Sequence, residues 1–71
     1  MKERKYRELV ELKGLIRQKK MTYQGLADLM GISLSALCDK INGFSIFLLT
    51  EVAQIAKILE ISIDKIVFYF F

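Results

Sequence analysis

The chain has 71 residues, of which 54% are hydrophobic and 27% are charged, with four glycines and no proline. This composition excludes disordered, collagen-like and low-complexity chains, and it predicts one small domain, residues 1–71, with a single core. The chain has one cysteine, Cys38, and no histidine, which excludes an intrachain disulfide and a zinc site with the usual ligands. We therefore expect neither a metal nor a cofactor.

The chain shows no sign of a membrane segment. Its first stretch alternates charged with apolar residues, unlike the apolar block of a signal peptide. The longest apolar run, residues 66–71, is far shorter than the roughly 20 residues that span a bilayer. The sequence therefore predicts a cytoplasmic protein that does not enter a membrane.

Charge is distributed unevenly along the chain. Residues 1–20 carry eight basic and three acidic side chains, whereas residues 21–71 carry three basic and five acidic ones. A basic first third on a small domain favours a polyanionic partner. The alternative is a solvated helix face, because lysine and glutamate both favour helices.

The first predicted helix covers residues 4–20. Apolar residues between Tyr6 and Ile16 recur at spacings of three and four, which is typical of an amphipathic helix. Gly14 lies inside this pattern and weakens the helix by up to about 1 kcal/mol relative to alanine without ending it.

Two shorter helices are predicted next. Thr22 offers an N-cap oxygen to a helix over residues 23–30, and Gly31 stands where a left-handed residue would end it. Ser33 offers the next cap, to a third helix that runs to about Ile41.

The rest of the chain is predicted to add a loop and two more helices. Asn42 and Gly43 both tolerate positive φ and are expected to end the third helix. Thr50 is the expected cap of a fourth helix and Ser62 that of a short fifth, so these two helices fall within residues 50–70. No segment alternates long enough to predict a strand, which makes the domain all-α with five helices. The loop residues expected to fill the core between the third and fourth helices are Phe44, Ile46 and Phe47, with an interface between two copies as the alternative.

Residues 22–43 have the layout of a helix-turn-helix, in which a short glycine-containing turn joins two helices. We expect Ala27 at the crossing of the two helices, where a larger side chain would push them apart. The second helix is then held clear of the surface and can enter a DNA major groove about 12 Å wide. The predicted core between the helices consists of Leu26, Met30, Ile32 and Leu37.

An ordered set of segments, spread between about residues 12 and 67, carries a family resemblance. The segments are Ile16-Arg17, Leu26-Ala27, Gly31-Ile32-Ser33, Asn42-Gly43, 55–59 and 61–66. In this order they resemble the Cro/phage-repressor (XRE-like) helix-turn-helix family, and within it the short prophage-type transcriptional regulators. The resemblance implies a five-helix, lambda-repressor-like DNA-binding domain.

The resemblance also assigns roles to individual residues. In that family the first motif helix lies across the DNA backbone and the second reads bases. The implied base-reading residues are Leu34, Ser35, Ala36, Cys38 and Asp39. The implied backbone contacts are Tyr23, Gln24, Lys40, Asn42 and Arg17. Because the reading helix offers no arginine or glutamine for bidentate contacts, we expect modest base discrimination, with DNA shape supplying part of it.

Three positions depart from the family pattern. Tyr23 stands where glutamine is frequent, and it can pack as readily as bind phosphate. Ile41 stands where many relatives have a glutamate that pairs with the arginine matching Arg17. Arg17 is therefore expected to meet solvent, another carboxylate or phosphate instead. Lys40 replaces an apolar residue, so we expect Ile41 to take over the packing and the Lys40 ammonium to lie in water.

The chain ends in an apolar and aromatic run, residues 66–71, that allows three interpretations. The aromatic side chains can cover the domain's own core, form a homodimer patch, or precede further domains of a longer regulator. The homodimer is favoured, because two-fold dimers suit palindromic operators. The interface residues would be Phe68, Tyr69, Phe70 and Phe71.

These observations favour a sequence-specific transcriptional regulator of phage or prophage repressor type, with double-stranded DNA as its partner. The alternative is a helical protein–protein adaptor, such as an antirepressor or assembly factor, that keeps the fold without reading DNA. No nucleophile–base pair is visible, so neither an enzyme nor a small-molecule substrate is expected. The DNA hypothesis requires residues 34–39 to be exposed and clear of the aromatic run.

Overall fold

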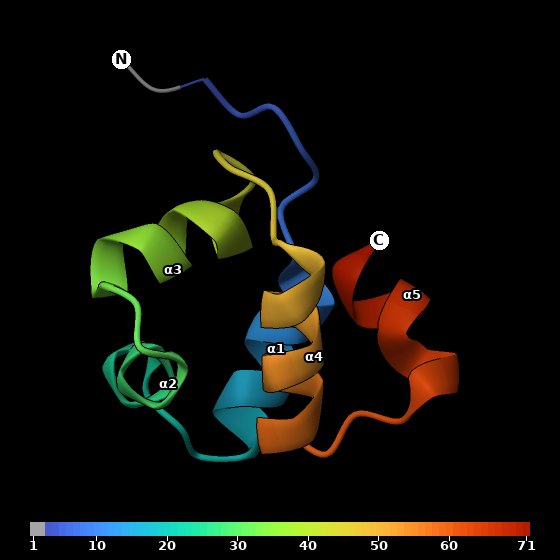
Figure 1. Ribbon diagram of the computed structural model, residues 1–71. Coiled ribbons are helices and arrows are strands. Elements are labelled where there is room, and N and C mark those ends of the chain that lie inside the picture. The colour runs from blue at the N-terminus through green and yellow to red at the C-terminus, as the bar shows by residue number, and fades with distance from the viewer. Residues whose placement is uncertain (1–2) are drawn as a thin grey trace.

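A computed structural model describes residues 3–71 as an all-α domain with five α-helices and, within that range, no strand (Figure 1). The predicted fold class is therefore confirmed. None of the helices in this part of the chain has the length and hydrophobicity to cross a membrane. The helices are α1 (Val10–Gln18), α2 (Tyr23–Met30), α3 (Leu34–Asn42), α4 (Leu49–Ile58) and α5 (Ile66–Phe70), with a 3₁₀ turn, η1 (Ile63–Lys65), before α5.

One hydrophobic core holds the helices together. Each helix contributes residues at three- and four-residue spacing, so α2 packs on α3 and α1 packs on α5. The largest of the fully buried side chains, at most 1% exposed, are Leu12, Ile16, Leu26, Leu37, Ile41, Ile55 and Leu59. Such a small core makes each of these side chains a large share of the total stability.

The predicted boundaries of the two central helices are confirmed. The Thr22 Oγ1 accepts a hydrogen bond from the Gly25 N–H at 2.9 Å, and the Ser33 Oγ accepts one from the Ala36 N–H at 3.1 Å. Gly31 and Gly43 follow α2 and α3 with φ of +73° and +90°, the left-handed conformation that glycine adopts without strain.

The prediction of a helix over residues 4–20 is wrong at its N-terminal end, because α1 begins only at Val10. The preceding segment is not helical, and it lies against the end of α3. The N–H groups of Lys5 and Tyr6 both donate to the Gly43 carbonyl, at 2.8 and 2.9 Å, and the Leu9 N–H donates to the Ile41 carbonyl at 3.0 Å. Backbone partners far along the chain thus replace the helical hydrogen bonds that the local pattern predicted.

Two expected caps in the C-terminal half are also wrong. Thr50 lies inside the first turn of α4, and the Glu51 carboxylate accepts a hydrogen bond from the N-cap Leu48 N–H at 2.9 Å. Ser62 precedes the 3₁₀ turn but its side chain caps no helical N–H. Its hydroxyl instead bonds the Asp64 side chain, which lowers the pKa of that carboxyl.

The aromatic run has two faces. Phe70 is buried, and its ring meets Phe47 edge-on with centroids 5.5 Å apart, while Tyr69 is half-buried. Phe68 and Phe71 remain exposed. Two of the four aromatic residues therefore cover the domain's own core, and the other two do not.

Of the loop residues expected in the core, Phe44 and Phe47 are half-buried, but Ile46 is exposed, which corrects that part of the prediction.

Candidate nucleic-acid interface

The contact between α2 and α3 forms as the sequence predicts. Ala27 and Leu37 are both fully buried, and the Ile32 N–H donates to the Ala27 carbonyl at 3.1 Å across the turn. A methyl group at residue 27 allows the helices to approach closely, and a left-handed Gly31 turns the chain between them. Leu26 and Met30 are buried beside them, and Ile32 is packed against the same cluster.

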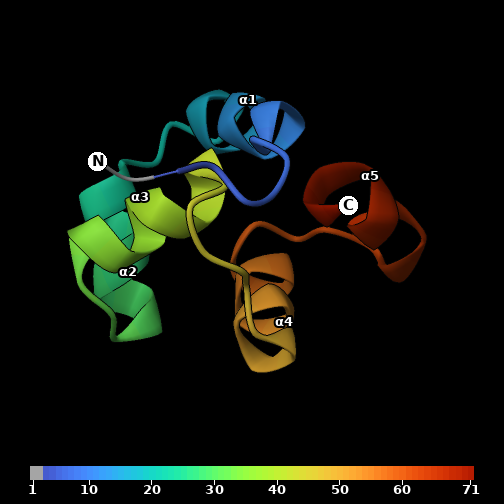
Figure 2. The ribbon, with the colours of Figure 1, turned by 90° about the horizontal axis from the view of Figure 1, so that it is seen from above.

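The N-terminal half of α3 is open to solvent. Leu34 is 39% exposed and Ser35 is exposed, whereas Ala36, Cys38 and Asp39 are half-buried. Two views from perpendicular directions place α3 on one side of the domain and α5 on the other (Figures 1 and 2). The aromatic end of the chain therefore does not cover this helix, which meets one part of the requirement set by the DNA hypothesis. The exposure that the hypothesis also requires is present at Leu34 and Ser35 and only partial at Ala36, Cys38 and Asp39.

The N-terminus of α2 presents one polar and one packed side chain. Tyr23 is half-buried and packs against the core, which favours its packing role over a phosphate contact. Gln24 is exposed, and its Nε2 donates to the Asp28 Oδ1 at 2.8 Å, one turn along the helix. The first N–H groups of a helix attract anions, so this end of α2 offers a phosphate position.

Lys40 contradicts the expectation that its ammonium lies in water. The Nζ is 2.9 Å from the Glu51 Oε1 and donates to the Ile46 carbonyl at 3.3 Å, and the two charged side chains are only 14% and 11% exposed. The adjacent Ile41 is fully buried, as predicted. The sequence pattern could not reveal this pair, because its two members lie eleven residues apart on different helices.

The Glu51 carboxylate contacts both Lys40 and the N-terminus of α4. Burial acts to raise the pKa of the Glu51 carboxyl, but the hydrogen bond from the Leu48 N–H and the contact with Lys40 outweigh it. The pKa of Glu51 therefore lies below its ordinary value, and the carboxylate is charged at neutral pH. The Lys40–Glu51 pair thus fixes α3 relative to the loop and to α4.

Basic residues that the sequence placed in a helix lie instead at the end of α3. The Arg4 Nε donates to the carbonyl of Asn42 at 2.7 Å, and the guanidinium lies 5.5 Å from the centre of the Phe44 ring. Asn42 itself is half-buried. The N-terminal segment, residues 4–9, therefore brings Arg4 and Lys5 beside the predicted reading helix. No local signal in the sequence indicates this placement, since it depends on contacts about 38 residues away.

Arg17 lies near the end of α1 and is exposed. Among the described residues it forms no ion pair or hydrogen bond with a side chain, so no carboxylate replaces the partner that Ile41 removes. Three other basic residues of the first third, Arg4, Arg7 and Lys13, are partly neutralised by ion pairs. Arg4 and Lys13 flank Glu8 at 3.4 and 2.6 Å.

Residues 3–71 contain no group of three or more His, Cys, Asp and Glu side chains that could hold a metal ion.

Helix α3 has an exposed N-terminal half and packs tightly on α2 across a glycine-containing turn. This arrangement is typical of helix-turn-helix DNA-binding proteins. The class also accounts for the basic residues gathered around one end of that helix.

Residues 3–69 match the family model described as the BetR domain, so the chain belongs to the BetR domain family. This family is a helix-turn-helix-like DNA-binding domain, which identifies the chain as a DNA-binding regulatory domain. No curated protein and no solved structure matches the chain. The likeness to the Cro/phage-repressor family finds no counterpart in these comparisons and remains a resemblance.

Proposed function

We propose that this domain is a sequence-specific transcriptional regulator of phage or prophage repressor type, which acts by occupying an operator. The observation that carries the proposal is the exposed N-terminal half of α3, supported from beneath by buried Ala27 and Leu37. Its role is to bind DNA rather than to catalyse a reaction.

Base reading is assigned to the outer residues of α3. Leu34 and Ser35 are the most exposed, so they reach furthest into a major groove. Ser35 can donate to or accept from base edges, and Leu34 can pack on thymine methyl groups. Ala36, Cys38 and Asp39 are half-buried and contribute at the margin of the contact. Short side chains of this kind give modest discrimination, which DNA shape supplements.

Backbone contacts are assigned to residues on both sides of α3. Gln24 lies at the N-terminus of α2, Asn42 ends α3, and Arg17 is an exposed cation near the end of α1. Arg4 and Lys5 add positive charge beside Asn42. Lys40 acts through its pair with Glu51, by holding the end of α3 in place.

We also propose that the regulator is a homodimer formed through the outer face of α5. Val67, Phe68 and Phe71 are 68%, 55% and 72% exposed, an apolar surface on the side of the domain away from α3 (Figure 1). Exposed apolar surfaces of this kind mark interfaces. Phe70 and Tyr69 face inward and support the interface rather than form it.

A titration of the protein against fragments of its own genomic neighbourhood, at two salt concentrations, tests DNA binding. The account predicts tight binding to one fragment and a steep loss of affinity with salt. Ser35→Arg should change the preferred sequence, whereas Arg17→Gln should weaken binding to every sequence and reduce the salt slope by about 1. Lys65→Gln removes the same charge on the α5 side and serves as the matched control. Binding that ignores salt, or no binding to any fragment, would contradict the proposal.

The exposed face of α5 also favours a second function, that of a protein–protein adaptor. In that case the same apolar residues bind another protein, and the domain needs no DNA. Light scattering and pull-down without nucleic acid separate the two functions. If the domain is an adaptor, the Phe68→Ser/Phe71→Ser double variant should no longer bind the partner protein. If the domain binds DNA, a single copy of the same variant should still contact DNA through α3.

A further inference from the structure

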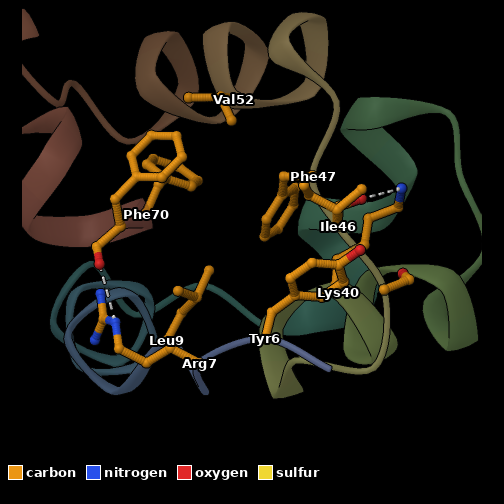
Figure 3. A pocket seen from close by; sticks show the side chains of 10 residues that line it. Tyr6, Arg7, Leu9, Lys40, Ile46, Phe47, Val52 and Phe70 are labelled. Carbon is orange, nitrogen blue, oxygen red and sulfur yellow. Dashed lines mark hydrogen bonds between the residues drawn. The ribbon is translucent and has the colours of Figure 1, made fainter. Parts of the chain in front are cut away.

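A cavity lies between the N-terminal segment, the loop before α4, α4 itself and α5 (Figure 3). Its volume is about 230 Å³. Four apolar side chains, from four different parts of the fold, face its centre: Leu9, Phe47, Val52 and Phe70. Apolar cavities of about 150 Å³ are large enough to bind benzene, so this one has room for a single ring with a short substituent.

The charged side chains that line the cavity are cationic. Its lining includes Arg7 and Lys40 but no aspartate or glutamate. The two cations lie at different places on its rim, with Arg7 beside the α5 end and Lys40 beside Ile46 (Figure 3). The site therefore suits a ligand that is apolar at one end and negatively charged at the other.

The two cations differ in how free they are to bind an anion. Lys40 is 2.9 Å from Glu51 and its side chain is 14% exposed, so its charge is already neutralised. The Arg7 side chain is 43% exposed, and its Nη1 is 3.3 Å from Glu11, a looser pair. The Arg7 Nε donates to the Phe71 carbonyl at 3.1 Å, which holds the guanidinium at the mouth of the cavity. The remaining guanidinium donors suit a carboxylate.

We propose that this cavity binds a small aromatic monocarboxylate, with its ring packed against Phe47 and Phe70 and its carboxylate on Arg7. The Phe47 and Phe70 rings already meet edge-on at 5.5 Å, and a third ring extends this aromatic contact. The ligand then touches the N-terminal segment through Leu9 and Arg7, α4 through Val52, and α5 through Phe70. It stabilises the segment that packs against the end of α3.

The proposal does not depend on DNA binding. If docking of the segment changes the DNA affinity of the domain, a ligand that favours the docked segment also changes that affinity, and linkage then requires DNA to change ligand affinity by the same factor. The direct test is made without DNA, so its failure leaves the proposed function standing. Failure of the DNA titration likewise leaves the cavity proposal standing.

The test follows the methyl resonances of Leu9 and Val52 by nuclear magnetic resonance during titration of the full chain. The probes are phenylacetate, its neutral amide phenylacetamide, and acetate. Phenylacetate should shift these methyl groups saturably, and phenylacetamide should bind about tenfold more weakly, because it lacks the charge that pairs with Arg7. Acetate, which has no ring, should leave the methyl resonances unmoved.

Two variants locate the contacts. Arg7→Gln should bring the affinities of phenylacetate and phenylacetamide to within about twofold of each other, and Lys65→Gln, which removes an exposed cation outside the cavity, should keep the preference. Val52→Phe should fill the cavity and abolish binding of both probes. If Val52→Phe fails to fold, the Arg7→Gln comparison decides alone. No saturable shift in the native chain, or equal affinity for acid and amide there, would overturn the proposal.

Discussion

Gly43 is the position where the account predicts the largest effect of adding a single methyl group. Its φ is +90°, and a Cβ there would lie 2.4 Å from the Tyr6 carbonyl oxygen and 3.0 Å from the Arg4 Cγ. The oxygen belongs to the backbone of the N-terminal segment, which packs against the end of α3. A flexible side chain such as that of Arg4 could rotate away from the new methyl group, but a backbone carbonyl cannot. Gly43→Ala must therefore displace the N-terminal segment itself.

Gly31→Ala is the matched control, because Gly31 also ends a helix in the left-handed conformation, with φ of +73°, but has open space around the added Cβ. Left-handed backbone costs alanine roughly 1–2 kcal/mol at either position. Gly43→Ala also breaks the hydrogen bonds from Lys5 and Tyr6 to the Gly43 carbonyl. At about 0.5–1.5 kcal/mol each, their loss brings its total to roughly 2–5 kcal/mol.

Urea denaturation followed by circular dichroism measures both variants. Gly43→Ala should be the less stable by about 1–3 kcal/mol, which corresponds to a difference in melting temperature of at least about 4 °C for a domain of this size. Amide exchange at Lys5 and Tyr6 should accelerate in Gly43→Ala and stay slow in Gly31→Ala. Equal destabilisation by the two substitutions would refute the docking of the N-terminal segment on Gly43.

Two further substitutions test the ion pair and the helix crossing. Glu51→Gln should cost about 1–3 kcal/mol at neutral pH, because it leaves the Lys40 ammonium half-satisfied in a largely buried position. Since the folded-state pKa of Glu51 is lowered, the stability it supplies is present above the ordinary carboxyl pKa and is lost as pH falls through the folded value. The difference between the native chain and Glu51→Gln should therefore shrink in urea melts below about pH 4, and a pH-independent difference would count against the pair. Leu37→Ala, at a fully buried site between α2 and α3, should cost about 2–5 kcal/mol by thermal denaturation, and a loss below 1 kcal/mol would mean that this crossing is loosely packed.

The features that the sequence predicts correctly are local ones. Thr22 and Ser33 cap their helices through hydrogen bonds that span three residues, and Gly31 and Gly43 end them through their own backbone conformation. Ala27 is buried because helical spacing places it on the inner face of α2. Each of these signals lies within a few residues of the structure that it determines.

The features that the sequence does not reveal depend on contacts between distant segments. The N-terminal segment leaves the helical pattern because its N–H groups bond the Gly43 and Ile41 carbonyls. The Lys40 ammonium is largely buried because Glu51 lies beside it. The same carboxylate accepts a hydrogen bond from the Leu48 N–H, so the N-cap of α4 is Leu48 and not Thr50. Helical periodicity describes one helix at a time, so it contains no information on such partners.

The most direct test of the central claim is a map of backbone amide shifts when a DNA fragment that the protein binds is added. The account predicts the largest changes at Leu34 and Ser35, with further changes at Gln24 and Arg4. The amide shifts of α5 should change little on addition of DNA, because any dimer contact through α5 should already be present without DNA. Changes concentrated on α5, with Leu34 and Ser35 unmoved, would contradict the assignment of α3 as the reading helix.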